Sequence, residues 1–233
     1  MKINKKVVVI TGGNSGLGKA TAKILSTQHH VVILGKNVQE VTKTAKEFKC
    51  EGIICDITDA KQIKNSFLQI IKKYKKVDCL INCAGVWIEG PIEKNNADEI
   101  KKAISVNVIG TFLMVNAVVP QLKKQKFGKI INISSRAGLN AKPDRSVYNA
   151  SKWAVTGFTK CLQLELSPFG IGVTGFYPGF IHTDLFEKAG INKKNFKMAM
   201  PVDKPAKALA FLVNYDDDVL INSFEIESLK EAK

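Results

Sequence analysis

The stretch VVVITGGNSGLG, residues 7–18, decides the fold that this chain is expected to adopt. Its apolar start fits a buried strand, which leads into a glycine-rich turn and then into helical spacing. Gly12 lets the chain turn sharply, Gly16 lets a pyrophosphate approach the backbone, and Gly18 has no side chain to hinder helix–strand packing. The free N–H groups at the start of that helix would face the phosphates. The alternative is an ordinary glycine-rich turn.

The same order of strand and helix is repeated outward from this stretch. Further apolar runs lie at 31–34, 53–55, 79–81, 129–133, 171–176 and 224–226, and helical spacing lies at 17–28, 38–48, 59–74, 98–125, 148–167 and 203–213. Strands without polar alternation are buried on both faces, which indicates a parallel sheet covered by helices. We therefore predict an α/β fold: a single doubly wound Rossmann-type domain over residues 1–233, with a parallel sheet of about seven strands and helices on both faces.

Length and composition agree with a globular domain. A chain of 233 residues allows one large domain or two small ones. Its content of 45% hydrophobic and 24% charged residues excludes a disordered, collagen-like or coiled-coil chain. Because the sequence contains no run of about 18 apolar residues, we expect no segment that spans a membrane and no membrane partner.

The net charge of +14 first suggests an anionic partner such as nucleic acid. However, Arg136 and Arg145 are the only arginines, and the lysines are scattered along the chain. Because base reading depends on arginine forks, we predict a solvated lysine-rich surface and no nucleic acid. Five cysteines without a signal peptide indicate reduced thiols in the cytoplasm. Cys79 and Cys83 lack a paired histidine or a second CxxC, so no metal is expected.

A second set of polar residues follows the later strands. Tyr148 and Lys152 lie four residues apart in YNASK, on one face of a predicted helix. Ser135 ends a predicted strand thirteen residues before Tyr148, and Asn107 lies in SVNV. Together with the G-x3-G-x-G spacing of residues 12–18, these motifs resemble the short-chain dehydrogenase/reductase family, in the subgroup with TGxxxGxG and YxxxK motifs. The resemblance covers almost the whole chain.

This resemblance implies an oxidoreductase that moves a hydride between nicotinamide and a carbonyl or secondary alcohol. Tyr148 would exchange the proton, and Lys152 would lower the pKa of that phenol and hold the nicotinamide ribose. Ser135 would donate to the carbonyl oxygen as charge develops there, and Asn107 would hold a water that links Lys152 to solvent. Each residue has a structural alternative: a tyrosine that covers the core, a turn serine, and an asparagine at a helix kink.

The cofactor is expected where the first strands end. The second strand ends in Gly35-Lys36-Asn37 instead of the acid that accepts from a ribose 2′-hydroxyl, so NADP(H) is favoured over NAD(H). Lys36 is otherwise one more surface lysine. The family's adenine-binding acid is matched by Asp56, whose alternative is a helix N-cap. The predicted cofactor-binding residues are Thr11, Gly12, Asn14, Ser15, Gly16, Leu17, Gly18, Lys36, Asp56, Ile57, Asn82, Ala84, Gly85, Tyr148, Lys152, Pro178, Gly179, Ile181 and Thr183.

We therefore predict an NADP(H)-dependent oxidoreductase for a small-molecule carbonyl or alcohol. One alternative is a 3-oxoacyl-[acyl-carrier-protein] reductase, although the chain lacks the glycine-rich ending usual in those enzymes. Another is a non-catalytic NADP-sensing protein. Substrate contacts are expected from residues 86–93, 136–146 and 180–200, and the last of these forms either a mobile lid or a small helical cap. The resemblance also implies a homodimer or homotetramer that packs through the two long helices.

Overall fold

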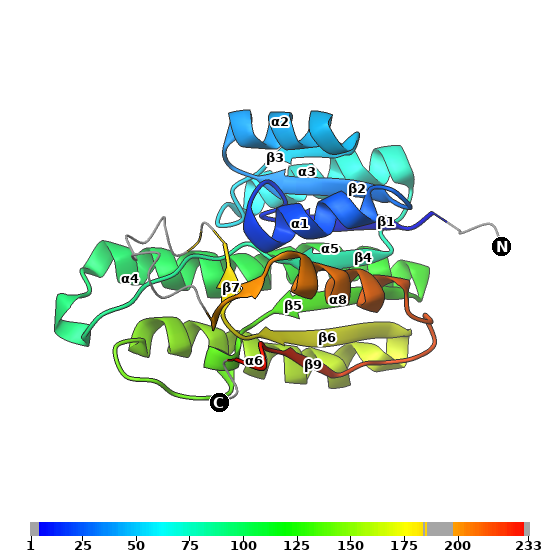
Figure 1. The fold of residues 1–233 in the computed structure, drawn as a ribbon. Helices are drawn as coiled ribbons and strands as arrows, with labels where there is room; N and C mark the ends of the chain where they lie inside the picture. Colours follow the sequence, from blue (N-terminus) through cyan, green and yellow to red (C-terminus); the bar gives the residue numbers. More distant parts are fainter. Residues whose placement is uncertain (1–4, 184, 186–197, 231–233) are drawn as a thin grey trace.

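A seven-stranded sheet lies at the centre of the computed structural model, which describes residues 5–183, 185 and 198–230. The strand order is β3-β2-β1-β4-β5-β6-β9, and every neighbouring pair is parallel (Figure 1). The α/β class and the seven-stranded parallel sheet predicted from the sequence are confirmed. The strands are β1 (Val7–Thr11), β2 (His30–Gly35), β3 (Glu51–Ile54), β4 (Cys79–Asn82), β5 (Gly128–Ile133), β6 (Ile171–Pro178) and β9 (Ser223–Ile226).

Helices cover both faces of this sheet (Figure 1). One face carries α1 (Gly16–Leu25), α2 (Val38–Phe48) and α8 (Asp203–Asn214), and the other carries α3 (Ala60–Tyr74), α5 (Thr111–Gln125) and α6 (Ser146–Leu166). Successive strand residues point to opposite faces. Val8 and Ile10 of β1 therefore join the hydrophobic cluster under α1, whereas Val7 and Val9 join the cluster under α3.

Local sequence explains where several helices begin. Asn37, Asp59 and Asn96 each stand one residue before a helix, and each side chain accepts a hydrogen bond from an N–H of the first turn. The continuous helix predicted over 98–125 is divided into α4 (Ala97–Ile104), a π-helical turn η2 (Ser105–Gly110) and α5. The other described elements are η1 (Ile92–Lys94), η3 (Arg136–Gly138), η4 (Ser167–Phe169), β7 (Ile181–His182) and β8 (Met200–Pro201).

The stretch Ala97–Gln125 is, within the described residues, long and apolar enough to cross a membrane by length and composition. However, its apolar side chains Met114, Val115, Val118 and Leu122 are buried in the cluster shared with α3 and the sheet. The stretch is therefore a core helix of this domain.

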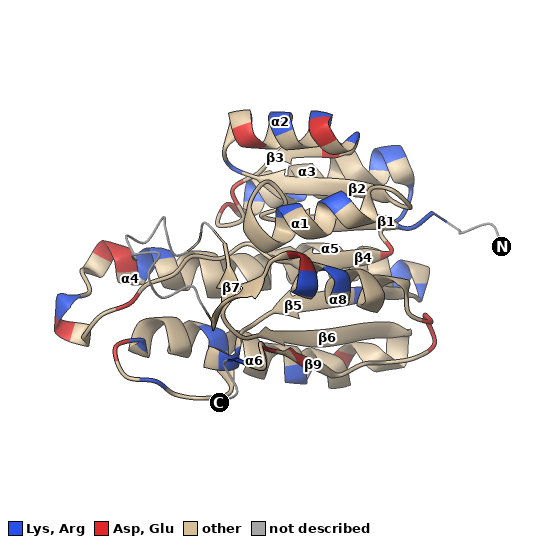
Figure 2. Ribbon diagram, viewed as in Figure 1, with Lys and Arg blue, Asp and Glu red and all other residues tan. Residues whose placement is uncertain are grey.

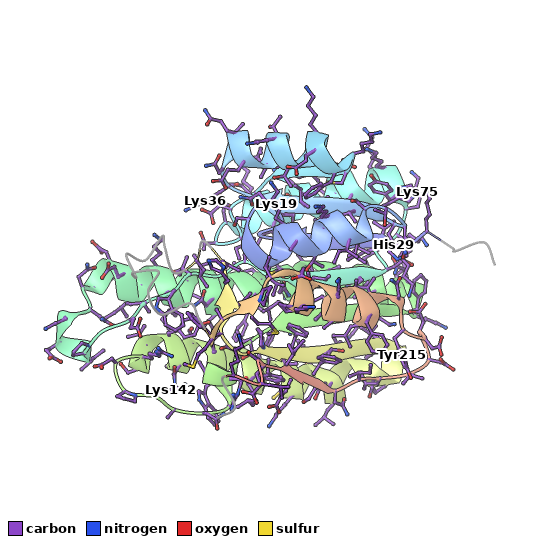
Figure 3. The ribbon with its side chains drawn as sticks, viewed as in Figure 1. Lys19, His29, Lys36, Lys75, Lys142 and Tyr215 are labelled. Atoms are coloured by element: carbon purple, nitrogen blue, oxygen red, sulfur yellow. The ribbon has the colours of Figure 1, made fainter. Side chains whose placement is uncertain are left out.

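The loop after α8 is fastened to the amino ends of β1 and β5. Asp217 accepts from Lys6 Nζ at 2.7 Å and pairs with Lys129 Nζ at 2.9 Å. The same two ammonium groups donate to the carbonyl oxygens of Val213 and Tyr215, at 2.9 and 2.6 Å. Figure 3 shows Tyr215 at the end of the sheet opposite Lys36. In the view of Figure 2, basic residues occur on α1, α2, α6 and α8 rather than on one element.

The predicted lid segment, 180–200, lies largely outside the described residues, which omit 184 and 186–197. At its base, β7 pairs with β8, so that Ile181 lies opposite Met200 and His182 opposite Pro201. Whether the segment forms a lid or a cap stays a prediction.

Candidate active site

The catalytic candidates meet where β5 ends and α6 begins. Ser135 follows β5 with extended backbone and caps η3, its Oγ accepting from Ala137 N at 3.1 Å. Its side chain also acts on the phenol of Tyr148, whose pKa it lowers. The neighbouring Ser134 points elsewhere, because its Oγ donates to the carbonyl oxygen of Lys152 at 2.9 Å. Ser135 is therefore the serine that faces the phenol.

Tyr148 is a buried phenol, only 6% exposed. Burial raises its pKa to about 12, although the hydrogen bond with Ser135 and the positive charge of Arg145 lower it in part. Its ring lies against the indole of Trp87, with the two centroids 4.2 Å apart and the planes inclined by 49°. At neutral pH the phenol is protonated and can donate its proton.

Lys152 is buried beside this phenol. Its Nζ donates to the carbonyl oxygen of Ile133 at 3.0 Å and lies 5.8 Å from the ring centroid of Tyr148. Burial lowers the pKa of Lys152 to about 8. Ser135 and Arg145 lower the pKa of Tyr148 in part, and the predicted lowering of that pKa by Lys152 stays a prediction. The ammonium has a backbone acceptor at the end of β5.

Asn107 lies in η2 and anchors the loop after β4. Its Oδ1 accepts from Val86 N at 2.8 Å, and its Nδ2 donates to Val86 O at 3.0 Å and to Ser151 Oγ at 3.1 Å. A Cβ built on Gly85 would lie 3.3 Å from Asn107 Oδ1 and 3.8 Å from Lys152 Nζ. The structure thus brings Asn107, Gly85 and Lys152 together, with the side-chain amide engaged by the backbone. The water relay through Asn107 stays a prediction.

The glycine-rich loop forms a tight cradle between β1 and α1. Gly12 has a positive φ of 65°, and a Cβ there would lie 2.9 Å from Ala84 Cα. Gly16 has a φ of 48°, and a Cβ on Gly18 would lie 2.4 Å from Gly12 O. Side chains at these positions would fill the cradle or separate α1 from β1. Ser15 precedes α1 without a side-chain capping hydrogen bond. The cradle and the start of α1 therefore fit a dinucleotide pyrophosphate.

Thr11 and Leu17 have structural contacts beside this cradle. Thr11 Oγ1 accepts from Cys83 N and Ala84 N, both at 3.0 Å, so it ties the end of β1 to the loop after β4. Leu17 is buried in the cluster under α1. Both residues shape the predicted cofactor site through packing rather than through a side chain presented to solvent.

The residues predicted for the adenosine end lie near the ends of β2 and β3. Asp56 Oδ1 accepts from Thr58 N at 2.9 Å and from Thr58 Oγ1 at 2.7 Å. Partial burial opposes ionisation of Asp56, but these hydrogen bonds and the charge of Lys36 hold its pKa below the ordinary value. Ile57 is buried, and a Cβ on Gly110 would meet its Cδ1 at 2.6 Å.

A hollow of about 230 Å³ opens beside the glycine-rich loop and α2. Asn14 Nδ2 donates to Glu40 Oε2 at 2.7 Å across it, and a Cβ on Gly35 would lie 2.1 Å from Asn14 Oδ1. Asn14 thus occupies the space beyond Gly35 at the end of β2. The lining residues are Asn14, Ser15, Gly16, Lys19, Glu40, Lys43 and Thr44.

The remaining predicted residues lie toward the carboxyl ends of β4 and β6. Asn82 Nδ2 donates to Asn132 Oδ1 at 2.9 Å, which links β4 to β5. Gly179, after Pro178, donates its N–H to Ile226 O at 2.8 Å, and Ile181 begins β7. A Cβ on Gly16 would meet Thr183 Cβ at 3.5 Å. Thr183 therefore lies against the glycine-rich loop although the two are distant in sequence.

Trp87, Glu89 and Arg145 lie in the loops 86–93 and 136–146, from which substrate contacts are predicted, although none of the three is predicted individually. Both arginines of the chain lie between Ser135 and Tyr148. This distribution is a sequence signal for the site, because the two arginines of an otherwise lysine-rich chain both stand in the segment between the two catalytic candidates. Within the described residues, no group of three His, Cys, Asp or Glu side chains is arranged to hold a metal ion.

The fold and the site define a class: α/β proteins with a dinucleotide cradle at β1 and a serine–tyrosine–lysine cluster at β5 and α6. The sequence model described as short chain dehydrogenase matches residues 6–194. The chain belongs to this family and is an oxidoreductase.

Individual relatives agree with this assignment. The chain is 34% identical to the 3-oxoacyl-[acyl-carrier-protein] reductase FabG of Thermotoga maritima, over 81% of this chain and 79% of the relative. A 3-ketoacyl-(acyl-carrier-protein) reductase of Brucella melitensis, complexed with NADH, superposes with a TM-score of 0.90 at 26% identity, over 98% of this chain and 99% of that chain. ElxO with NADP bound superposes with a TM-score of 0.88 at 27% identity, over 99% and 100%.

Proposed function

We propose that this protein is an NADP(H)-dependent oxidoreductase that interconverts a carbonyl compound and a secondary alcohol, with Tyr148 as its acid and base. One observation carries the proposal: the buried Tyr148 has Ser135 and the buried Lys152 beside its phenol. A proton donor and a second hydrogen-bond donor at one point suit a carbonyl oxygen that gains negative charge.

The bound cofactor would supply or accept the hydride. The positive-φ glycines and the start of α1 would hold its pyrophosphate, and Asp56 would accept from the adenine amino group. Lys152 would hold the nicotinamide ribose. Because the pKa of Lys152 is about 8, its ammonium can also donate a proton near neutral pH and so reprotonate the Tyr148 phenolate.

The preference for NADP(H) rests on charge at the adenosine end. Lys36 follows Gly35, which offers no carboxylate to a ribose 2′-hydroxyl, and Lys19 and Lys43 line the hollow beside it. Lys19 is already paired with Glu47 at 3.0 Å. Glu40 lines the same hollow and opposes an added phosphate. Lys36, Lys19 and Lys43 together outnumber Glu40 and Glu47, so the net charge at this end favours an added phosphate.

A second candidate activity is the reduction of 3-oxoacyl groups on acyl carrier protein. The likeness to the Thermotoga maritima reductase favours it. A non-catalytic NADP-binding role is less well supported because the serine, tyrosine and lysine occur together.

We further propose that two or four copies assemble through α5 and α6 in the cytoplasm. Ile109 beside α5 and Leu164 on α6 are 46% and 79% exposed, and a Cβ on Gly157 would meet nothing within 4 Å. An apolar, open helix surface of this kind suits a second copy of the chain. All five cysteines are free thiols, which suits a reducing compartment.

The test is hydride transfer by the purified protein with NADPH or NADH and a panel of ketones and 3-oxoacyl thioesters, followed by nicotinamide absorbance. We expect turnover of ketones with preference for NADPH. Tyr148→Phe should lower kcat by about a hundredfold or more, since the proton donor is lost. Tyr215→Phe, at the opposite end of the sheet, is the matched control and should keep full activity. Full activity in Tyr148→Phe would contradict the acid–base role. An absence of turnover together with no thermal stabilisation by either nucleotide would contradict the enzyme.

A further inference from the structure

Two loops at the active-site end of the sheet are joined by a carboxylate. Glu89, in the loop after β4, accepts at Oε1 from both Nε and Nη2 of Arg145, each at 3.0 Å. Arg145 stands immediately before α6 and three residues before Tyr148. Next to this ion pair, Gly90 N donates to Asp144 O at 2.7 Å. The loops are therefore linked through side chains and through backbone.

The same carboxylate fixes Trp87. Trp87 Nε1 donates to Glu89 Oε2 at 3.3 Å, and the guanidinium carbon of Arg145 lies 5.1 Å from the centroid of its ring. The preceding residue, Val86, forms two hydrogen bonds with the side-chain amide of Asn107. Its N–H donates to Asn107 Oδ1, and its carbonyl oxygen accepts from Asn107 Nδ2. Because both the backbone and the indole edge are held, Trp87 is a rigid wall rather than a free surface side chain.

This wall adjoins the reacting group. The indole lies 4.2 Å from the Tyr148 ring, and the two side chains share a small apolar cluster with Ile88, Ala103 and Val147. Tyr148 is 6% exposed, whereas Trp87 keeps part of its surface accessible. The indole therefore borders the side chain that a carbonyl compound has to approach.

The charges of this cluster cancel. Arg145 and Glu89 form a one-to-one pair, about one third exposed on each side chain. A carboxylate beside the reacting carbonyl would have to compete with Glu89 for the guanidinium. A neutral flat group gains contact with the indole without breaking that pair.

We propose that Trp87, held by Glu89 and Arg145, is a specificity-determining residue that selects carbonyl compounds bearing a neutral, flat apolar group beside the reacting carbon. This inference rests on the proposed carbonyl reduction and adds to it the class of substrate.

The first test compares diacetyl with acetylbenzoyl, which differ by a methyl or a phenyl group beside the reacting dicarbonyl. We expect the wild type to prefer acetylbenzoyl. Trp87→Ala should lower the ratio of kcat/KM for acetylbenzoyl to that for diacetyl by about tenfold. Tyr215→Phe, at the opposite end of the sheet, should keep the wild-type ratio. A Trp87→Ala ratio within twofold of the wild type would overturn the proposal.

A second variant tests the ion pair. Glu89→Gln removes the counterion of Arg145 and leaves the guanidinium charge unbalanced, so that it can attract an anion. We expect kcat/KM for the anionic benzoylformate to rise relative to acetylbenzoyl by several-fold. An unchanged or lower ratio would show that the Arg145–Glu89 ion pair does not lie beside the bound substrate, and it would contradict the proposal.

A binding measurement separates this inference from the proposed function. In Trp153→Phe, Trp87 is the sole tryptophan, so its emission reports the wall directly. With NADP⁺ present, benzyl alcohol should change that emission at concentrations where isopropanol has no effect. Equal responses to the two alcohols would overturn the inference even if ketones are reduced. If no ketone is reduced, the proposed function fails, and the comparison of alcohols still decides whether Trp87 selects a flat group.

Discussion

Lys36 is the single residue on which the choice between the two nicotinamide cofactors depends most. It is exposed where β2 ends, and its charge reaches Asp56. Lys36→Asp replaces an attractive charge by a repulsive one next to the expected 2′-phosphate. We expect the ratio of kcat/KM for NADPH to that for NADH to fall by about tenfold or more, a free-energy change of about 1.4 kcal/mol. Initial rates with each cofactor at fixed ketone concentration measure this ratio.

Lys46→Asp, farther along α2, changes the net charge by the same amount and should leave the ratio close to the wild type. Glu40→Gln should move it the other way, since Glu40 lines the same hollow. Equal ratios in Lys36→Asp and Lys46→Asp would show that Lys36 is only a surface lysine.

Single residues were predictable where a motif fixes both their type and their place. Tyr148, Lys152 and Ser135 stand at fixed distances along one helix and one strand end, so sequence spacing sufficed to bring them together. Trp87 and Arg145 are separated by 58 positions in irregular loops. Their contact depends on how the two loops meet, which no local pattern encodes.

Helix–strand packing at α1 depends on the absence of one side chain. A Cβ on Gly18 would lie 2.4 Å from the carbonyl oxygen of Gly12, which is backbone and cannot move aside. Gly18→Ala should therefore push α1 from β1, destabilise the fold by about 1–3 kcal/mol, and weaken nucleotide binding. Urea unfolding and a thermal-shift titration with NADPH measure the two effects.

Gly172, on β6, is the matched control for this substitution. A Cβ there would meet only Leu220 Cδ1, at an ordinary 3.5 Å. Gly172→Ala should thus keep nucleotide binding. Equal losses of binding in the two variants would mean that the close approach of Gly18 to Gly12 does not matter.

The sequence predicts helices and strands best where their side chains are most buried. The inner strands β2, β1, β4, β5 and β6 are short, mostly buried apolar runs, so their sequences carry a clear pattern. The division of 98–125 into α4, η2 and α5 was missed because the apolar pattern continues through it. The π-helical turn contains Asn107, whose side chain is bonded to the backbone of Val86 in the loop after β4. A tertiary contact of this kind leaves no local pattern in the sequence. The pairing of β7 with β8 involves two residues on each side and leaves no periodic signal.

At the amino end of the sheet, the Asp217 carboxylate lies between Lys6 and Lys129 and so links the loop after α8 to β1 and β5. Partial burial opposes ionisation of Asp217, but hydrogen bonds from Lys6 and Lys129 hold its pKa below the ordinary value. A lowered pKa in the fold stabilises the native state at pH values above about 3.9, and this contribution is lost as the pH falls through the folded-state pKa. Asp217→Asn should cost at most about 1 kcal/mol at neutral pH, because the carboxylate is largely exposed.

Urea unfolding of wild type and Asp217→Asn at neutral and acidic pH tests this prediction. The two proteins should converge in acid, and added salt should reduce their difference at neutral pH. Asp218→Asn, an exposed neighbour, should match the wild type throughout. A difference that stays constant across the pH range would exclude a role of the Asp217 charge.

The two outermost strands of the sheet, β3 and β9, are only four residues long. An outer strand exposes a row of unpaired N–H and C=O groups, on which a strand of another molecule can add. On β3, the Glu51 carboxylate is already held by Lys73 and Tyr74 of α3, both at 2.7 Å. Because each outer strand is so short, a foreign strand would gain few hydrogen bonds there. The edges of this sheet are therefore poor templates for a strand of a second molecule. Concentrated solutions of the folded protein should not form fibrils by strand addition at β3 or β9.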